Sequence, residues 1–111
     1  MESGNGYISA EIRQNNGKLY LEVDRMVTRK VILKNKTGLH ARPASEVVAF
    51  AKELPCKVYI ENNGKKAAAD SILQLLALGA KEGSELMLSA EGEGAKASVE
   101  KMDSFLQILE G

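Results

Sequence analysis

The chain has 111 residues, in which 15 lysines and arginines are balanced by 15 aspartates and glutamates. That length builds one packed core and is too short for two, and the balanced charge excludes a general attraction to nucleic acid or to an anionic membrane surface. No run of about 18 apolar residues is present, so we expect no membrane insertion. With one cysteine and one histidine, we expect no internal disulfide, no metal site and no cofactor.

Residues 1–25 predict a β-hairpin that extends a domain spanning residues 26–111. Apolar residues alternate on both sides of an Asn16-Gly17 turn signal, and they are Ile8, Ala10, Ile12, Leu19, Leu21 and Val23. A lone hairpin is marginally stable, so this one should dock on the sheet of the domain or on a second chain, unless it is partly disordered or has no role. Residues 1–14 lack the basic and then apolar pattern of a signal peptide, which indicates a cytoplasmic protein.

The next part of the chain predicts a strand, a helix and a second strand. A strand is expected over residues 26–33 because its apolar residues alternate onto one face, and they are Val27, Val31 and Leu33. A helix is expected over residues 41–54, with one proline in its first turn and another just past its end. Residues 56–61 alternate again and predict the second strand.

Asn63-Gly64 predicts a tight turn after that strand. The elements that follow are a return strand, a short helix, a strand and an amphipathic helix, expected over residues 66–69, 70–79, 84–91 and 94–111. Asp70 or Ser71 is the expected N-cap of the short helix. The order from Met26 is β-α-β-β-α-β-α, which is typical of an α+β sandwich whose helices cover one face of a mainly antiparallel sheet.

The single histidine, His40, lies where the first strand ends and the first helix begins, in KNKTGLHARPAS at residues 34–45. A lone histidine at such a place is more often a cap or a surface residue than a reactive group. Here the helix N-terminus offers N–H groups and a partial positive charge, and Arg42 adds a charged fork suited to phosphate. The turn at Thr37 and Gly38 can bring the imidazole over that helix end. Together these features predict a histidine that carries phosphate rather than a hydrolase, because no second base or nucleophile pair is nearby.

Three segments, TGLHARPAS, DSILQLLALG and LSAEGE, resemble the HPr family of histidine-containing phosphocarriers in the bacterial phosphoenolpyruvate-dependent sugar phosphotransferase system. The resemblance covers residues 26–111. It implies an open-faced β-sandwich, in which a four-stranded antiparallel sheet is covered on one face by three helices. It also implies that His40 accepts phosphate on Nδ1 from enzyme I and passes it to enzyme IIA domains, and that Arg42 stabilises the phosphoryl group. The neighbours expected to complete this site are Thr37, Gly38, Ala41 and Pro43.

Ser71 falls where Gram-positive members of that family carry a regulatory serine, which an ATP-dependent HPr kinase/phosphorylase phosphorylates. Ser71 is equally suited to cap its helix, and a phosphate at a helix N-terminus is favourably placed. Asp70, however, stands where many members have lysine, and its carboxylate would repel a phosphate. The sequence therefore leaves regulation through Ser71 open.

The helix after Ser71 is apolar on more than one face. Ile72 and Leu75 can pack inward, which leaves Leu73 and Leu76 as an expected exposed patch beside His40 for partner proteins. The alternative is that all four residues belong to the core. A shuttle must release each partner quickly, so the resemblance favours small and weak interfaces.

The leading interpretation is a phosphocarrier that is transiently phosphorylated on histidine and is not itself an enzyme. One alternative is a regulatory binding module that docks to a transcriptional regulator when Ser71 is phosphorylated, although the retained His40 favours phosphate transfer. Another is a carrier in a parallel nitrogen-related or dihydroxyacetone-related phosphotransfer chain, which the extension at residues 1–25 weakly favours.

Overall fold

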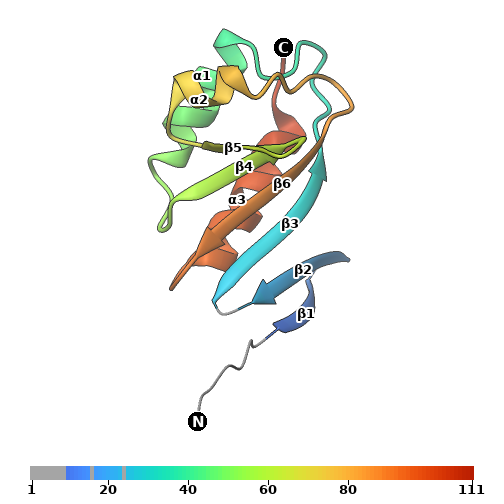
Figure 1. The fold of residues 1–111 in the computed structure, drawn as a ribbon, viewed down its shortest axis with the longest axis vertical. Coiled ribbons are helices and arrows are strands. Elements are labelled where there is room, and N and C mark those ends of the chain that lie inside the picture. The colour runs from blue at the N-terminus through green and yellow to red at the C-terminus, as the bar shows by residue number, and fades with distance from the viewer. Residues whose placement is uncertain (1–9, 16, 24) are drawn as a thin grey trace.

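The computed structural model describes residues 10–15, 17–23 and 25–111, so Ile8 and Asn16 of the predicted hairpin lie outside the described residues. The strands are β1 (Ala10–Asn15), β2 (Lys18–Val23), β3 (Met26–Ile32), β4 (Val58–Asn62), β5 (Lys65–Ala68) and β6 (Glu85–Glu91). The helices are α1 (Ala41–Ala51), α2 (Ile72–Ala77) and α3 (Ala95–Ile108) (Figure 1).

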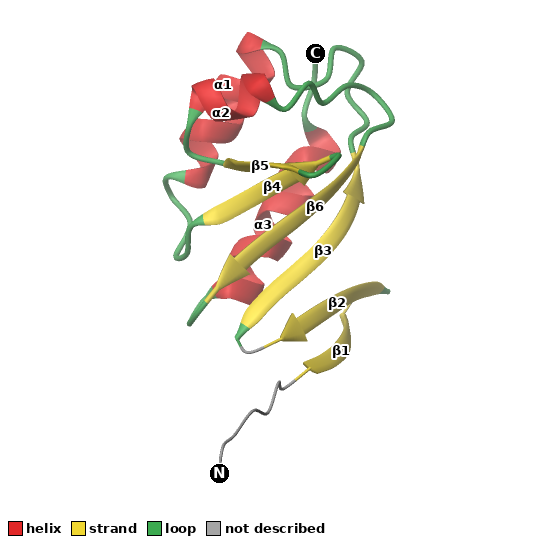
Figure 2. Ribbon diagram, viewed as in Figure 1, coloured by secondary structure: helices red, strands yellow, loops and turns green. Residues whose placement is uncertain are grey.

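The strands form one antiparallel sheet in the order β1-β2-β3-β6-β4-β5. The helices lie on one face of this sheet and leave the other face open (Figure 2). Helix α3 packs across β3, β4 and β6, whereas α2 packs against β5 and α1. The predicted open-faced α+β sandwich is confirmed, and its sheet is two strands wider than four because β2 of the N-terminal hairpin pairs with β3.

The core fills the space between the sheet and the helices. Alternate strand residues point into it, as the sequence predicts, among them Val27, Val31, Val58, Ile60, Leu86 and Leu88. The helices contribute Val47, Leu75, Val99, Met102 and Leu106 from the opposite side. Burial of this apolar surface, worth roughly 25 cal/mol per Å², is the main force that holds the two layers together.

The second predicted strand begins later in the structure than the alternation suggests. It starts at Val58 rather than at Cys56. The Cys56 N–H donates to the Ser98 hydroxyl at 3.0 Å, so this residue is tied to α3 instead of to a neighbouring strand. Cys56 is nevertheless partly buried against the core, which explains why the apolar alternation begins two residues before the strand does.

The N-terminal hairpin presents its apolar side chains to the open face of the sheet. Ile12, Leu19 and Leu21 are 72%, 58% and 42% exposed, whereas Tyr20, between the last two, is 2% exposed on the helix side. Pairing explains this orientation, because Leu21 lies opposite Thr28 of β3, and residues directly opposite each other share a face. The alternation in the hairpin therefore marks the open face and not the core.

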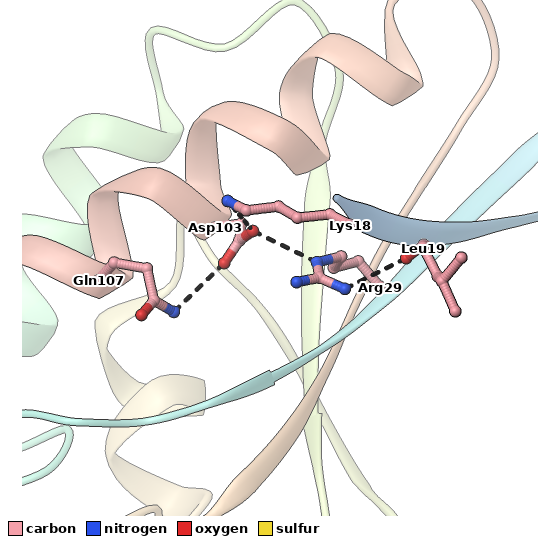
Figure 3. Close-up of polar contacts among 5 residues, drawn as sticks. All are labelled: Lys18, Leu19, Arg29, Asp103 and Gln107. Atoms are coloured by element: carbon pink, nitrogen blue, oxygen red, sulfur yellow. Dashed lines mark hydrogen bonds and ion pairs between the residues drawn. The ribbon is translucent and has the colours of Figure 1, made fainter. Parts of the chain in front are cut away.

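An ion-pair cluster under the hairpin fixes it to the last helix (Figure 3). The Asp103 carboxylate in α3 is 1% exposed, and its Oδ2 accepts from Lys18 Nζ at 2.8 Å and from Arg29 Nε at 3.3 Å. Its Oδ1 accepts from Gln107 Nε2 at 3.3 Å. Arg29 also donates to the carbonyl oxygen of Leu19 in β2 at 3.2 Å. A single carboxylate thus links β2, β3 and α3.

Tyr20 lies beside this cluster, on the helix side of the sheet. Its ring lies 5.6 Å from Arg29 Cζ and 6.0 Å from Lys96 Nζ, distances at which a cation and an aromatic face attract. Burial raises the pKa of Tyr20, the charges of Glu100 and Asp103 raise it further, and Arg29 opposes them. The hairpin is therefore attached by both an aromatic ring and a charged network.

We predict that Asp103→Ala lowers the free energy of unfolding by about 2 kcal/mol or more, because it leaves two cations without their buried acceptor. Glu85→Ala is the matched control, since it breaks the Lys30–Glu85 pair, which is 3.8 Å long with both side chains more than 60% exposed. Such an exposed pair contributes at most about 1 kcal/mol. Urea unfolding of both variants measures the difference, and equal losses would show that the cluster does not hold the hairpin.

Candidate functional site

The loop between β3 and α1 carries the predicted site and is held by other parts of the chain. The Leu39 N–H donates to the carbonyl oxygen of Ala80 at 3.0 Å, and the Thr37 N–H donates to that of Gly111, the last residue of the sequence, at 3.0 Å. The loop therefore packs between the segment after α2 and the segment after α3. Both contacts join residues that are more than 40 positions apart in the sequence.

The loop is also closed on itself by Asn35, which is 5% exposed. The Gly38 N–H donates to the backbone oxygen of Asn35 at 3.2 Å, and Asn35 Nδ2 donates to the Gly38 oxygen at 2.8 Å. The other side-chain atom, Asn35 Oδ1, is buried and has no hydrogen-bond partner among the described residues.

Gly38 is required at the tightest point of the loop. Its φ is +69°, a left-handed conformation that glycine adopts without steric cost. A Cβ atom there would collide with the carbonyl oxygen of Ala80 and with Cα of Lys81. The absence of a side chain thus allows the loop to lie directly against the backbone of residues 80 and 81.

His40 is the N-cap residue of α1, with φ −75° and ψ 178°. Its backbone oxygen accepts the first helical hydrogen bond, from Ala44 N at 2.8 Å, but its side chain makes no capping hydrogen bond and is exposed. The first N–H groups of a helix have no intrahelical acceptor, and Pro43 has no N–H. The N–H groups of Ala41 and Arg42 therefore remain for an anion, in the positive potential of the helix end.

A shallow hollow borders His40. Its lining residues are Leu39, His40, Ala41, Leu76, Gly79, Ala80 and Lys81. Lys81 is the one cationic residue among them. The sequence alone does not connect Lys81 with this site, because no local pattern links it to a histidine 41 positions earlier.

Arg42 shares the helix end with His40 but lines a different hollow. Its side chain is 91% exposed, and Arg42 Nε lies 3.9 Å from Glu46 Oε2, one turn further along α1. The lining residues of this second hollow are Arg42, Glu46, Phe105, Ile108, Leu109, Glu110 and Gly111. The structure thus places Arg42 at the same helix end as His40, where its side chain pairs with Glu46 and lines the second hollow.

Helix α2 and its N-cap carry the remaining predicted residues, and Leu76 among them borders the site. Leu73 is 77% exposed and Leu76 is 41% exposed, whereas Leu75 is fully buried. Leu76 also lines the hollow next to His40, so an apolar patch adjoins the imidazole. Ser71 caps α2, because its side-chain oxygen accepts from the Gln74 N–H at 3.4 Å.

The described part of the chain contains no cluster of three or more His, Cys, Asp or Glu side chains that could hold a metal ion. Within the same residues, none of the helices is long and apolar enough to cross a membrane.

Comparison with known proteins places this geometry among phosphocarriers. Residues 27–107 match the family described as the PTS HPr component phosphorylation site. The HPr-like protein Crh of Bacillus subtilis is 40% identical over 82 residues, which cover 74% of this chain and 96% of the relative. Phosphocarrier protein HPr of Vibrio cholerae is 36% identical over 84 residues, which cover 76% of this chain and 99% of the relative.

Solved structures agree with these sequence matches. Phosphocarrier protein HPr from Bacillus anthracis superimposes with a TM-score of 0.69 at 32% identity, over 72% of this chain and 95% of that one. The solution structure of Crh, the Bacillus subtilis catabolite repression HPr, gives a TM-score of 0.55 at 38% identity, over 73% of this chain and 96% of that one.

We predict that Gly38→Ala lowers the free energy of unfolding by about 2 kcal/mol more than Gly79→Ala does, because overpacking adds about 1–3 kcal/mol to the cost of the left-handed conformation. Gly79 is the matched control, since its φ is +65° and a Cβ there meets no atom within 4 Å. Chemical unfolding of the two variants measures the difference. If both lose the same stability, the backbone contact at Gly38 is not as close as described.

Proposed function

The chain belongs to the HPr family of phosphotransferase-system phosphocarriers, and from that premise we propose that His40 accepts a phosphoryl group from enzyme I and passes it to enzyme IIA domains. The observation that carries this proposal is the position of His40. An exposed imidazole without a capping hydrogen bond lies directly at the N-terminus of α1. The imidazole nitrogen that would accept the phosphoryl group therefore lies next to the helix N–H groups that would stabilise its negative charge.

The transfer needs few groups. The lone pair of Nδ1 attacks the phosphorus of the phosphorylated donor, a bond forms between Nδ1 and phosphorus, and the bond to the donor breaks with its electron pair returning to the donor. The second transfer repeats these events with His40 as the donor. The Ala41 and Arg42 N–H groups and the helix dipole stabilise the phosphoryl oxygens. Because the protein returns to its first state without a net reaction of its own, it acts as a carrier and not as an enzyme.

Two cations supplement the helix end. The pair between Arg42 and Glu46 is exposed and 3.9 Å long, so it contributes little energy and leaves the guanidinium free to turn toward a phosphoryl group. Lys81 lines the hollow beside His40. Positive charge near the oxygens stabilises the transferring group, since phosphoryl transfer depends mainly on positioning and electrostatics.

Partner proteins would bind beside the imidazole. Leu73 and Leu76 form an apolar patch that adjoins the hollow of His40, and so small a patch suits brief contacts with successive partners. In this proposal residues 26–111 are the phosphocarrier unit, residues 1–25 are an added element, and the chain meets its partners in the cytoplasm. The match of residues 27–107 to the family supports that division.

We predict that incubation with enzyme I and phosphoenolpyruvate adds one phosphate that is lost in acid, as intact-mass analysis can show. His40→Ala should take up no phosphate and keep its fold, because His40 is exposed. Arg42→Ala should slow the uptake by about 100-fold, the lower end of the usual effect of losing one charge-stabilising group, because the helix end still supplies part of the stabilisation. Lys52→Ala is the control, since Lys52 is an exposed cation at the other end of α1, and it should leave the rate of phosphate uptake unchanged. Phosphate on the His40→Ala variant would contradict the proposal.

A second candidate function is regulatory binding controlled by phosphate on Ser71. Two observations favour it: Ser71 lies partly exposed at the start of α2, and the relatives include HPr-like Crh proteins, one solved as the catabolite repression HPr. A phosphoserine there would lie at a helix N-terminus, which favours its charge. The carboxylate of Asp70 would oppose it. In this function the modified α2 surface would bind a transcriptional regulator.

We predict that HPr kinase/phosphorylase and ATP add an acid-stable phosphate to Ser71, and that Asp70→Lys raises the rate of this modification by removing a repulsive charge. Mass spectrometry of the modified peptide identifies the residue. Ser45→Ala, in the first turn of α1, is the control and should be modified like the parent protein. A chain that stays unmodified in both the parent and the Asp70→Lys form would exclude this function.

A further inference from the structure

Asn35 has a buried amide at the base of the loop that carries His40. Its side chain lies 5% exposed, yet one of its two polar atoms, Oδ1, makes no hydrogen bond within the described part of the chain. A half-satisfied amide in the interior is unfavourable compared with an apolar side chain of similar size. The presence of such an amide in the interior therefore needs an explanation.

The hydrogen bond that the Asn35 amide makes to the loop explains its presence in the interior. Asn35 Nδ2 donates to the Gly38 oxygen at 2.8 Å, and that carbonyl belongs to the peptide unit joining Gly38 to Leu39, the residue directly before His40. The other described contacts of the loop, from Leu39 to Ala80 and from Thr37 to Gly111, join backbone to backbone. The Asn35 amide is the one side chain among the described residues that hydrogen-bonds the loop.

We propose that Asn35 is a positioning residue for His40. Its amide fixes the orientation of the Gly38 carbonyl and thereby the place of the imidazole relative to the N-terminus of α1. This role rests on the proposed phosphate transfer at His40. A phosphoryl group must meet both Nδ1 and the N–H groups of the helix end, and misplacement of a reacting group by about 1 Å can cost about 100-fold in rate.

The chain offers a matched control in Asn62. Asn62 is buried to a similar degree, at 4% exposure, and its Nδ2 donates to the backbone oxygen of Leu78 at 3.0 Å. Each Nδ2 donates to a backbone oxygen, but Asn62 holds the end of α2, whereas the acceptor of Asn35 belongs to the loop that carries His40. Loss of either amide should cost similar stability, and only the loss of Asn35 should displace His40.

The test measures phosphoryl transfer from enzyme I to the full chain at varied chain concentrations. For Asn35→Ala we expect a maximal rate at least about 10-fold lower with KM changed less than about twofold, because the patch at Leu73 and Leu76 is untouched. For Asn62→Ala we expect a maximal rate within about twofold of the parent. Amide hydrogen exchange should accelerate at Gly38 and Leu39 in the first variant and not in the second.

The outcomes distinguish a failure of the proposed function from a failure of this inference. If the parent chain takes up no phosphate on His40, the proposed function fails, whatever the variants do. If the parent is phosphorylated and Asn35→Ala transfers within twofold of it, or both variants slow equally, Asn35 has no positioning role. If Asn35→Ala does not fold, Asn35→Asp is used instead. Aspartate has the shape of asparagine, but it places an acceptor oxygen, in place of the donor Nδ2, against the Gly38 oxygen. A parental rate in Asn35→Asp would likewise overturn the inference.

Discussion

The close approach of the backbone at Gly38 to the segment at Ala80 and Lys81 is the constraint on which the site depends. It brings the end of β3 and the segment after α2 into direct contact, with Leu39 bonded to the Ala80 oxygen. The chain then enters α1 with His40 at the N-cap and its side chain outside the helix. A side chain at residue 38 would force this loop away from the backbone of residues 80 and 81, which line the hollow beside His40.

The site combines rigid backbone with weakly held side chains. Backbone hydrogen bonds and the Asn35 amide fix the loop, whereas the side chains of His40 and Arg42 stay exposed. A buried amide oxygen without a hydrogen bond, such as Asn35 Oδ1 among the described residues, is unfavourable, and local departures of this kind are expected mainly at functional sites. A carrier benefits from this division, because the acceptor must stay in place while its surroundings exchange one partner for another.

Local patterns predicted most of the fold and part of the site. Alternation located β3 and β6. Ser71, one of the two residues expected to cap α2, is its N-cap, and Leu73 and Leu76 are exposed, which was one of the two alternatives left open by their spacing. Residues that reach the site from a distance could not be found in this way, since nothing local links Lys81 or Gly111 to His40.

The hairpin exposed another limit of pattern reasoning. Alternation showed that one face of the hairpin was apolar, but the buried face is the one with Tyr20, because the Asp103 cluster in α3 draws Lys18 and Arg29 to that side.

The proposal that His40 carries the phosphoryl group is tested most directly by nuclear magnetic resonance of the phosphorylated protein labelled with ¹⁵N at histidine. We expect phosphorus coupled to His40 Nδ1, with amide shifts confined to the loop, the first turn of α1 and the segments packed against them. Coupling to Nε2, or shifts spread over the whole sheet, would contradict the account.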